Sequence, residues 1–138
     1  MLDIEPAGDG TSDLYAGTWV DRLIRVHESG AFDTSFRADL KGSGGALAVA
    51  KEGSGDVLLA PLGAETLFRF NRSGGLVGAP AFITPTSNGT LATIVPLQDG
   101  TGDLYIGGNF TTYNGAAVNH FARIHADGTL ASVVSGGP

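Results

Sequence analysis

The apolar residues of this chain fall in short runs that are separated by polar, glycine-containing turns. Residues 13–17, 56–60 and 103–107 alternate or cluster apolar side chains over only five positions, and no segment carries a 3.6-residue apolar period with capping residues. Short runs of this kind, bounded by turn residues, are typical of β-strands. The pattern therefore predicts an all-β chain.

The predicted strands recur in the same order three times. In each copy an apolar first strand, a polar turn, a second and a third strand, a two-residue turn and a short fourth strand follow one another. We expect first strands at 2–6, 47–50 and 91–96, third strands at 23–27, 67–71 and 121–125, and fourth strands that end at Phe36, Phe82 and Val134. Each copy thus predicts a four-stranded antiparallel meander.

Equivalent residues define a repeat of about 45 positions, a period that with several strands per unit is typical of β-propellers. The equivalent aspartates are Asp13, Asp56 and Asp103, and the equivalent arginines are Arg25, Arg69 and Arg123. A longer last interval comes from the inserted segment GNFTTYNGAAVN. We interpret residues 1–138 as a single propeller segment with repeats at approximately 1–43, 44–88 and 89–138.

The predicted fold is therefore three four-stranded antiparallel propeller blades. Propellers close with about four to eight blades, and a single repeat cannot bury its own core. Three blades leave one bare face at each end, so we expect part of a larger propeller or half of a six-bladed dimer. Self-association through the open blade faces is the expected partnership, as a head-to-tail dimer or as a filament.

The third copy carries a family likeness. Its stretch DGTGDLYIGGNFTTYNGAAVNHFARIHADGTL resembles the delta-60 repeat through the DG turn at 99–100, GGNF at 107–110, YNG at 113–115 and ARIHADG at 122–128. GAFDTSF at 30–36 is similar to the closing strand of that repeat, whereas copy two lacks the GG-aromatic step and the YNG turn. The resemblance implies a β-propeller and an extracellular or cell-surface location in a bacterium, and it implies no catalytic residues.

Composition narrows the possible partners. The net charge is −6 and no cluster of Lys or Arg is present, which argues against nucleic acid and against an anionic membrane surface. No apolar run approaches the roughly 20 residues of a membrane span, and the start MLDIEPAGDG lacks the features of a signal peptide, so we expect any targeting segment outside this sequence. The chain has no cysteine, which excludes disulfides and thiolate metal sites.

One turn suggests a metal site. Residues 8–17 are similar to the end of the calcium loop of integrin-type propellers, and calcium requires six to eight oxygen ligands. Asp9 and Asp13 supply two carboxylates, while the upstream positions hold Ala7 and Glu5. We therefore treat Asp9 and Asp13 as a weak calcium candidate and expect no other cofactor. The alternative is a hairpin turn whose Asp side chains bond to their own backbone.

Two further sets of residues have a structural and a binding interpretation. Phe110 and Tyr113, in the inserted segment, could form a stacking platform for a sugar or a peptide, or could pack between blades. Anion binding is conceivable for the repeated arginines, but repetition in every copy favours a structural role, such as a salt bridge or a bond to a neighbouring loop, with the repeated aspartate of the second strand as one candidate partner. Arg25, Arg69 and Arg123 are therefore expected to be structural.

The sequence predicts a protein that is not an enzyme. Nucleophilic catalysis needs a nucleophile beside a base with an orienting partner, and no serine, threonine or histidine stands in such a setting. We expect a structural or binding module of a bacterial extracellular or surface protein, acting in adhesion, assembly or as a filament subunit. A calcium-dependent carbohydrate-binding propeller is the alternative, and a polysaccharide-active enzyme with paired carboxylates is the weakest hypothesis.

Overall fold

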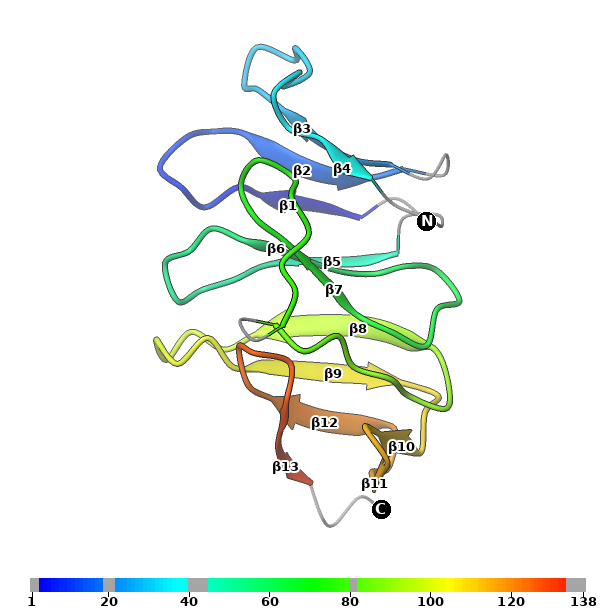
Figure 1. Cartoon of the computed structure of the whole chain (residues 1–138). Helices are drawn as coiled ribbons and strands as arrows, with labels where there is room; N and C mark the ends of the chain where they lie inside the picture. Colours follow the sequence, from blue (N-terminus) through cyan, green and yellow to red (C-terminus); the bar gives the residue numbers. More distant parts are fainter. Residues whose placement is uncertain (1–2, 19–21, 40–44, 80–81, 134–138) are drawn as a thin grey trace.

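The computed structural model describes residues 3–18, 22–39, 45–79 and 82–133, and within them the chain is built from antiparallel sheets that fan out one above the other (Figure 1). Four strands make blade 1: β1 (Ile4–Pro6), β2 (Leu14–Gly17), β3 (Arg22–Val26) and β4 (Ala38–Asp39). Blade 2 consists of β5 (Ala46–Val49), β6 (Val57–Ala60) and β7 (Phe68–Phe70). Blade 3 consists of β8 (Leu91–Pro96), β9 (Leu104–Gly108), β12 (Phe121–Ile124) and β13 (Leu130–Val133).

The prediction of an all-β chain of antiparallel meanders is confirmed, but that of three four-stranded blades is wrong in detail. The described residues form sheets of four, three and four strands, and a separate two-stranded hairpin of β10 (Thr112–Tyr113) and β11 (Ala116–Ala117). In blade 2 a single bridge between Phe70 and Leu76 stands where the fourth strand was expected. Blade 1 has the same kind of single bridge, between Val26 and Phe32, and its fourth strand β4 lies beyond the expected end at Phe36. The expected end of the last fourth strand at Val134 lies outside the described residues.

The three aspartates occupy equivalent positions, as the sequence predicts. Each stands directly before the second strand of its blade, and the following residue pairs with the third strand in the same register: Leu14 with Val26, Val57 with Phe70, and Leu104 with Ile124. This equivalence confirms the alignment of the three aspartates.

Alternate residues of each strand face opposite neighbours. We call the side of a blade that carries the repeated arginine its forward face, and the opposite side its rear face. In blade 2 the forward-face residues Leu58 and Ala60 belong to a core shared with blade 3, while the rear-face residues Val57 and Leu59 belong to a core shared with blade 1. All four residues of β6 are buried. The blades therefore stack forward face to rear face, and blade 2 is the middle layer.

A backbone contact joins each blade to the next. It lies at the turn that follows the third strand of the second of the two blades. The N–H of Arg37 donates to the carbonyl oxygen of Ser73 over 3.0 Å, and the N–H of Ile83 donates to that of Asp127 over 2.7 Å. A Cβ at Gly74 would lie 2.4 Å from the Arg37 carbonyl carbon, and one at Gly128 would lie 2.4 Å from the Ile83 oxygen. We call this arrangement the turn latch; it requires glycine because of the positive φ and the close backbone.

The inserted segment folds as a tight hairpin on blade 3. Its turn residues Asn114 and Gly115 have φ of 48° and 80°, as the two-residue turn between β10 and β11 requires. The side chain of Asn88 accepts hydrogen bonds from the N–H groups of Thr111 and Thr112 and donates to the Thr111 hydroxyl. One amide therefore fixes the start of the hairpin.

Over the part of the chain that the structure describes, no helix is long and apolar enough to cross a membrane.

Candidate functional site

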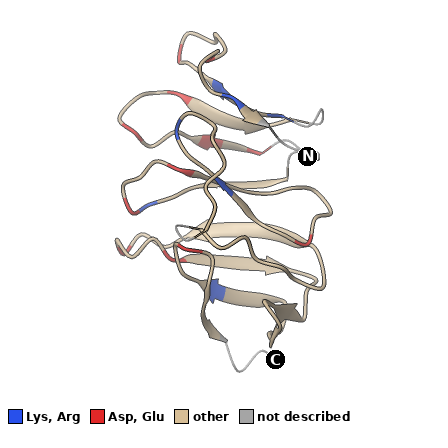
Figure 2. Cartoon of the chain, in the orientation of Figure 1, with Lys and Arg blue, Asp and Glu red and all other residues tan. Residues whose placement is uncertain are grey.

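Acidic residues gather at the turns between the first and second strands of the three blades, on one side of the molecule (Figure 2). These turns lie at the same end of each blade because the strands run in the same order. In every blade the arginine of the third strand points to the acidic turn of its own blade. Each of the repeated arginines thus forms a salt bridge, and the repeated aspartate is its partner in every blade.

In blade 1 the guanidinium of Arg25 binds two carboxylates. Its Nη2 lies 2.6 Å from Asp9 Oδ2, its Nε lies 2.9 Å from Asp13 Oδ2, and it stacks over the Tyr15 ring at 5.6 Å from the centroid. The other Asp9 oxygen accepts hydrogen bonds from the hydroxyl and the N–H of Thr11. The Thr11 hydroxyl, its N–H and the Arg25 guanidinium lower the pKa of Asp9 to about 2, although partial burial opposes the shift.

Blade 2 extends the same cluster across a blade boundary. Arg69 binds Glu52 and also Asp56, the latter with Nε 2.8 Å from Oδ2, and its Nη1 donates to the carbonyl oxygen of Ala126 over 2.7 Å. Ala126 lies in blade 3, in the turn after β12. The Arg69 side chain is only 9% exposed, so the guanidinium is nearly buried at the boundary with blade 3.

Blade 3 carries the same residues in an open setting. Arg123 Nε lies 2.8 Å from Asp103 Oδ2, but its Nη2 is 3.7 Å from Asp99, and the side chains of Arg123 and Asp99 are 32% and 45% exposed. The corresponding values for Arg25 and Asp9 are 11% and 8%. The cluster is therefore tight where a following blade covers it and loose where none of the described residues does.

Histidines add a contact that the sequence analysis did not find. Nδ1 of His27 lies 3.0 Å from Asp13, and Nδ1 of His125 lies 3.1 Å from Asp103. Both rings are about half exposed, and their equivalent in copy two is Asn71. The histidines stand at equivalent positions of copies one and three, and this equivalence is the sequence feature that indicates a shared contact. Since each aspartate also binds an arginine, the His–Asp pairs belong to the blade clusters.

At the calcium candidate, a single arginine already binds the two carboxylates. Asp9 and Asp13 both direct an oxygen to Arg25, and Asp9 uses its other oxygen in a turn with Thr11. Among the residues described, no three Asp, Glu or His side chains group in a way that could hold a metal ion. Asp9 thus makes the bonds expected of the alternative, in which the aspartate side chain stabilises its own hairpin turn.

The structure contradicts the prediction that Phe110 and Tyr113 form a stacking platform. Phe110 and Tyr113 are both 0% exposed, and the Tyr113 hydroxyl donates to the carbonyl oxygen of Gly128 over 2.7 Å. Burial raises the pKa of Tyr113 above its usual value, first through desolvation and then through the charge of Asp127. Neither ring offers a face to a ligand, because the hairpin folds back and both rings pack in the core shared by blades 2 and 3.

A hollow of about 650 Å³ lies at the outer edge of blade 1, beside the segment that runs from Phe32 to Ala38. Its wall is mostly apolar and includes Leu23, Ile24 and Phe32, with the guanidinium-bearing Arg22 and Arg37 beside them. No motif in the sequence indicated it. The hollow arises because the chain leaves β3 after the Val26–Phe32 bridge and returns to it only at Ala38.

The fold and its blade clusters define a class: a stack of β-propeller blades. Comparison with family models agrees. Residues 7–36 and 100–130 match a β-propeller family described as a domain of unknown function, DUF5122. The matched residues lie in copies one and three, and the divergent copy two falls outside them. No curated protein matches the chain.

The pKa of Asp9 leads to a prediction about acid stability. A carboxyl whose folded-state pKa lies below its unfolded value, about 4, stabilises the fold fully above that value and ceases to do so as the pH falls toward about 2. We expect the free energy of unfolding to drop over this window, and Asp9→Asn to flatten the drop. Urea denaturation between pH 2 and 6 measures it. The exposed Glu28 provides the control, since Glu28→Gln should leave the profile unchanged.

Proposed function

We propose that the chain is a non-enzymatic structural module of a bacterial extracellular or cell-surface protein, built from delta-60-type blades. The likeness of residues 99–128 to that repeat and the match to a propeller family of unknown function support the proposal. In this role the blades form a rigid support for assembly or adhesion. The repeated polar residues then serve cohesion between blades and are not reserved for a substrate.

The main observation in support of the proposal is the set of bonds that Arg69 makes. Its guanidinium binds Glu52, Asp56 and the backbone of blade 3 at once. A catalytic or binding arginine would keep at least one direction open to a ligand, whereas this one has its directions occupied by the protein. This nearly buried arginine, whose side chain is 9% exposed, is therefore part of a joint between two blades.

A calcium-dependent carbohydrate-binding module is the second candidate, because the turn at residues 8–17 is similar to a calcium loop. In our proposal millimolar calcium changes the melting temperature of the chain by no more than about one degree, since a ligand stabilises a protein only through its affinity for the folded state. Arg25 occupies both carboxylates that calcium would need. Differential scanning fluorimetry with calcium and with a chelator checks this expectation. A rise of many degrees that Asp9→Ala abolishes would favour the carbohydrate-binding module instead.

A panel of neutral and acidic oligosaccharides tests the structural role itself. Isothermal titration of the folded chain, with and without calcium, should give no heat of binding, and incubation should release no reducing sugar. Saturable binding would show that the module recognises a glycan, and sugar release would show that it is an enzyme. Either result would overturn the proposal.

A further inference from the structure

The two outer faces of the stack carry the residues that are buried at the internal blade boundaries. On the rear face of blade 1, Ile4 is 55% exposed and Leu14 is 40% exposed. Their equivalents by register are Leu47 and Val57 in blade 2, which are 2% and 0% exposed against blade 1. The rear face of blade 1 is thus an uncovered version of an interface that the chain already contains.

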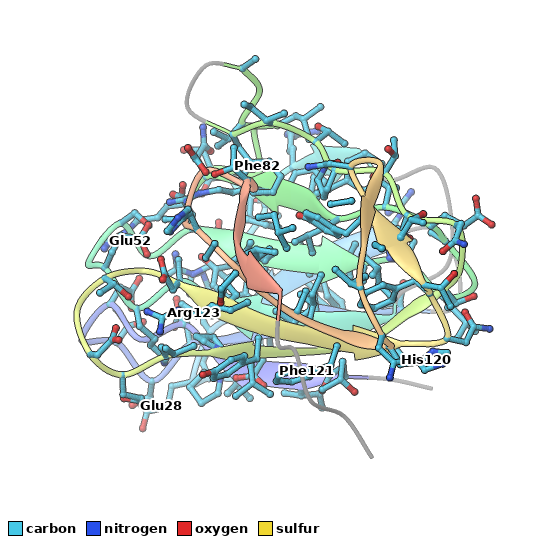
Figure 3. The ribbon with its side chains drawn as sticks, turned by 90° about the horizontal axis from the view of Figure 1, so that it is seen from below. Glu28, Glu52, Phe82, His120, Phe121 and Arg123 are labelled. Atoms are coloured by element: carbon cyan, nitrogen blue, oxygen red, sulfur yellow. The ribbon has the colours of Figure 1, made fainter. Side chains whose placement is uncertain are left out.

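The forward face of blade 3 is the opposite half of the same interface. Tyr105 and Phe121 stack with ring centroids 5.0 Å apart, Val95 beside them is 50% exposed, and Phe121 is 40% exposed. In blade 1 the residues equivalent to the two rings, Tyr15 and Leu23, are 0% and 2% exposed under blade 2. Figure 3, seen from the blade 3 end, shows Phe121 and Arg123 on this outer sheet.

The turn latch is also unoccupied on blade 1. Gly30 has a φ of 83°, like Gly74 and Gly128 with 87° and 86°, but no described atom lies within 4 Å of the position of a Cβ on it. At Gly74 and Gly128 the backbone of the preceding blade fills that space. Blade 1 therefore has the conformation of a latch that receives a preceding blade.

These observations indicate what covers the rear face of blade 1. Blade 1 has an apolar rear face and an open glycine turn, and blade 3 has an apolar forward face with a loose arginine cluster. The two internal boundaries show how a forward face and a rear face of this kind pack together. The hollow at the edge of blade 1 shares Ile24 and Phe32 with the rear face, so it adds room for side chains of the incoming blade. Contiguous exposed apolar surface of this kind marks an interaction site.

We propose that the rear face of blade 1 binds the forward face of blade 3 of a second copy of this chain, head to tail. In this contact the partner's blade 3 packs against the rear face of blade 1 in the same way as blade 1 packs against the rear face of blade 2. The proposal rests on the structural role argued above, but it concerns one specific contact. A heterologous contact of this type closes into a ring or continues as a filament.

The experiment pairs two charged substitutions at exposed positions, one on each face. Leu14→Asp alters the rear face of blade 1, and Phe121→Asp alters the forward face of blade 3. Leu62→Lys is the matched control, because Leu62 is 56% exposed in a blade 2 turn, outside both faces. Each chain is examined by sedimentation velocity over a range of concentrations, and circular dichroism with thermal melting verifies that it is folded.

We expect the unaltered chain and Leu62→Lys to associate, and each face variant alone to sediment as a monomer. An equimolar mixture of Leu14→Asp and Phe121→Asp should form a heterodimer and nothing larger, since one intact rear face then meets one intact forward face. A monomeric unaltered chain overturns the proposal and points to blades of a longer polypeptide as the occupants. Association that survives in either single variant also overturns it, because like faces would then be pairing. Neither of these results bears on glycan binding or catalysis, so the structural role is tested separately.

Discussion

Replacing Arg69 with methionine is expected to lower the free energy of unfolding by about 3 kcal/mol. The substitution keeps the aliphatic stem but leaves the carboxylates of Glu52 and Asp56 without their cation, and it removes the bond to the Ala126 carbonyl. Removing one partner of a buried ion pair is strongly destabilising because the remaining charge stays desolvated. Urea denaturation of the variant, compared with the unaltered chain at neutral pH, measures the loss.

Arg123→Met is the matched control for this prediction. Arg123 makes the same bond to its aspartate, but its side chain is 32% exposed and solvent screens the pair. Exposed ion pairs contribute about 1 kcal/mol or less, so we expect a loss no larger than that at concentrations below those at which chains associate. Equal losses at the two positions would show that burial by blade 3 is not what makes the Arg69 cluster important.

Replacing Gly128 with alanine is expected to cost about 3 kcal/mol through the turn latch. Part of the loss, about 1–2 kcal/mol, comes from the positive φ, and the rest from overpacking, since the new Cβ would lie 2.4 Å from the Ile83 oxygen and 3.1 Å from the Phe82 ring. Backbone cannot rotate away as a side chain can. Thermal and urea unfolding of the variant give the magnitude.

Gly30→Ala separates the two contributions. It has nearly the same φ, 83° against 86°, but open space around the Cβ position. In the dissociated chain it should lose only the conformational part, about 1–2 kcal/mol. If Gly30→Ala proved as harmful as Gly128→Ala, the close approach between blades 2 and 3 would be irrelevant to stability.

Local patterns predicted the sheets and the blade clusters, because both depend on residues that recur. The short apolar runs at β2, β6 and β9 indicated strands, and the repetition of Asp13 and Arg25 in every copy indicated a structural role for the arginine. Adjacent strands of a meander also pair with their neighbours in sequence, so their register needs no long-range information.

What the sequence did not predict depends on contacts between distant residues. Asn88 lies outside every strand, yet its amide holds the hairpin 23 residues further along the chain. Phe110 and Tyr113 resemble an exposed platform until the fold of that hairpin directs them into the core between blades 2 and 3. Likewise, the segments after β3 and β7 pair with their blades through single bridges at Phe32 and Leu76, and the sequence pattern alone does not distinguish such a bridge from a strand.

The position of β6 between two cores has a consequence for how the molecule opens. Leu58 and Ala60 belong to one core and Val57 and Leu59 to the other, so no described residue of blade 1 shares a core with blade 3. In a stack held only by nearest neighbours, stability is a sum of blade and boundary contributions. Blade 1 can therefore detach while blades 2 and 3 stay folded, and the reverse holds for blade 3. The amide protons of β6 are held by β5 and β7 in this middle layer, so we expect them to exchange with solvent more slowly than those of the outer blades.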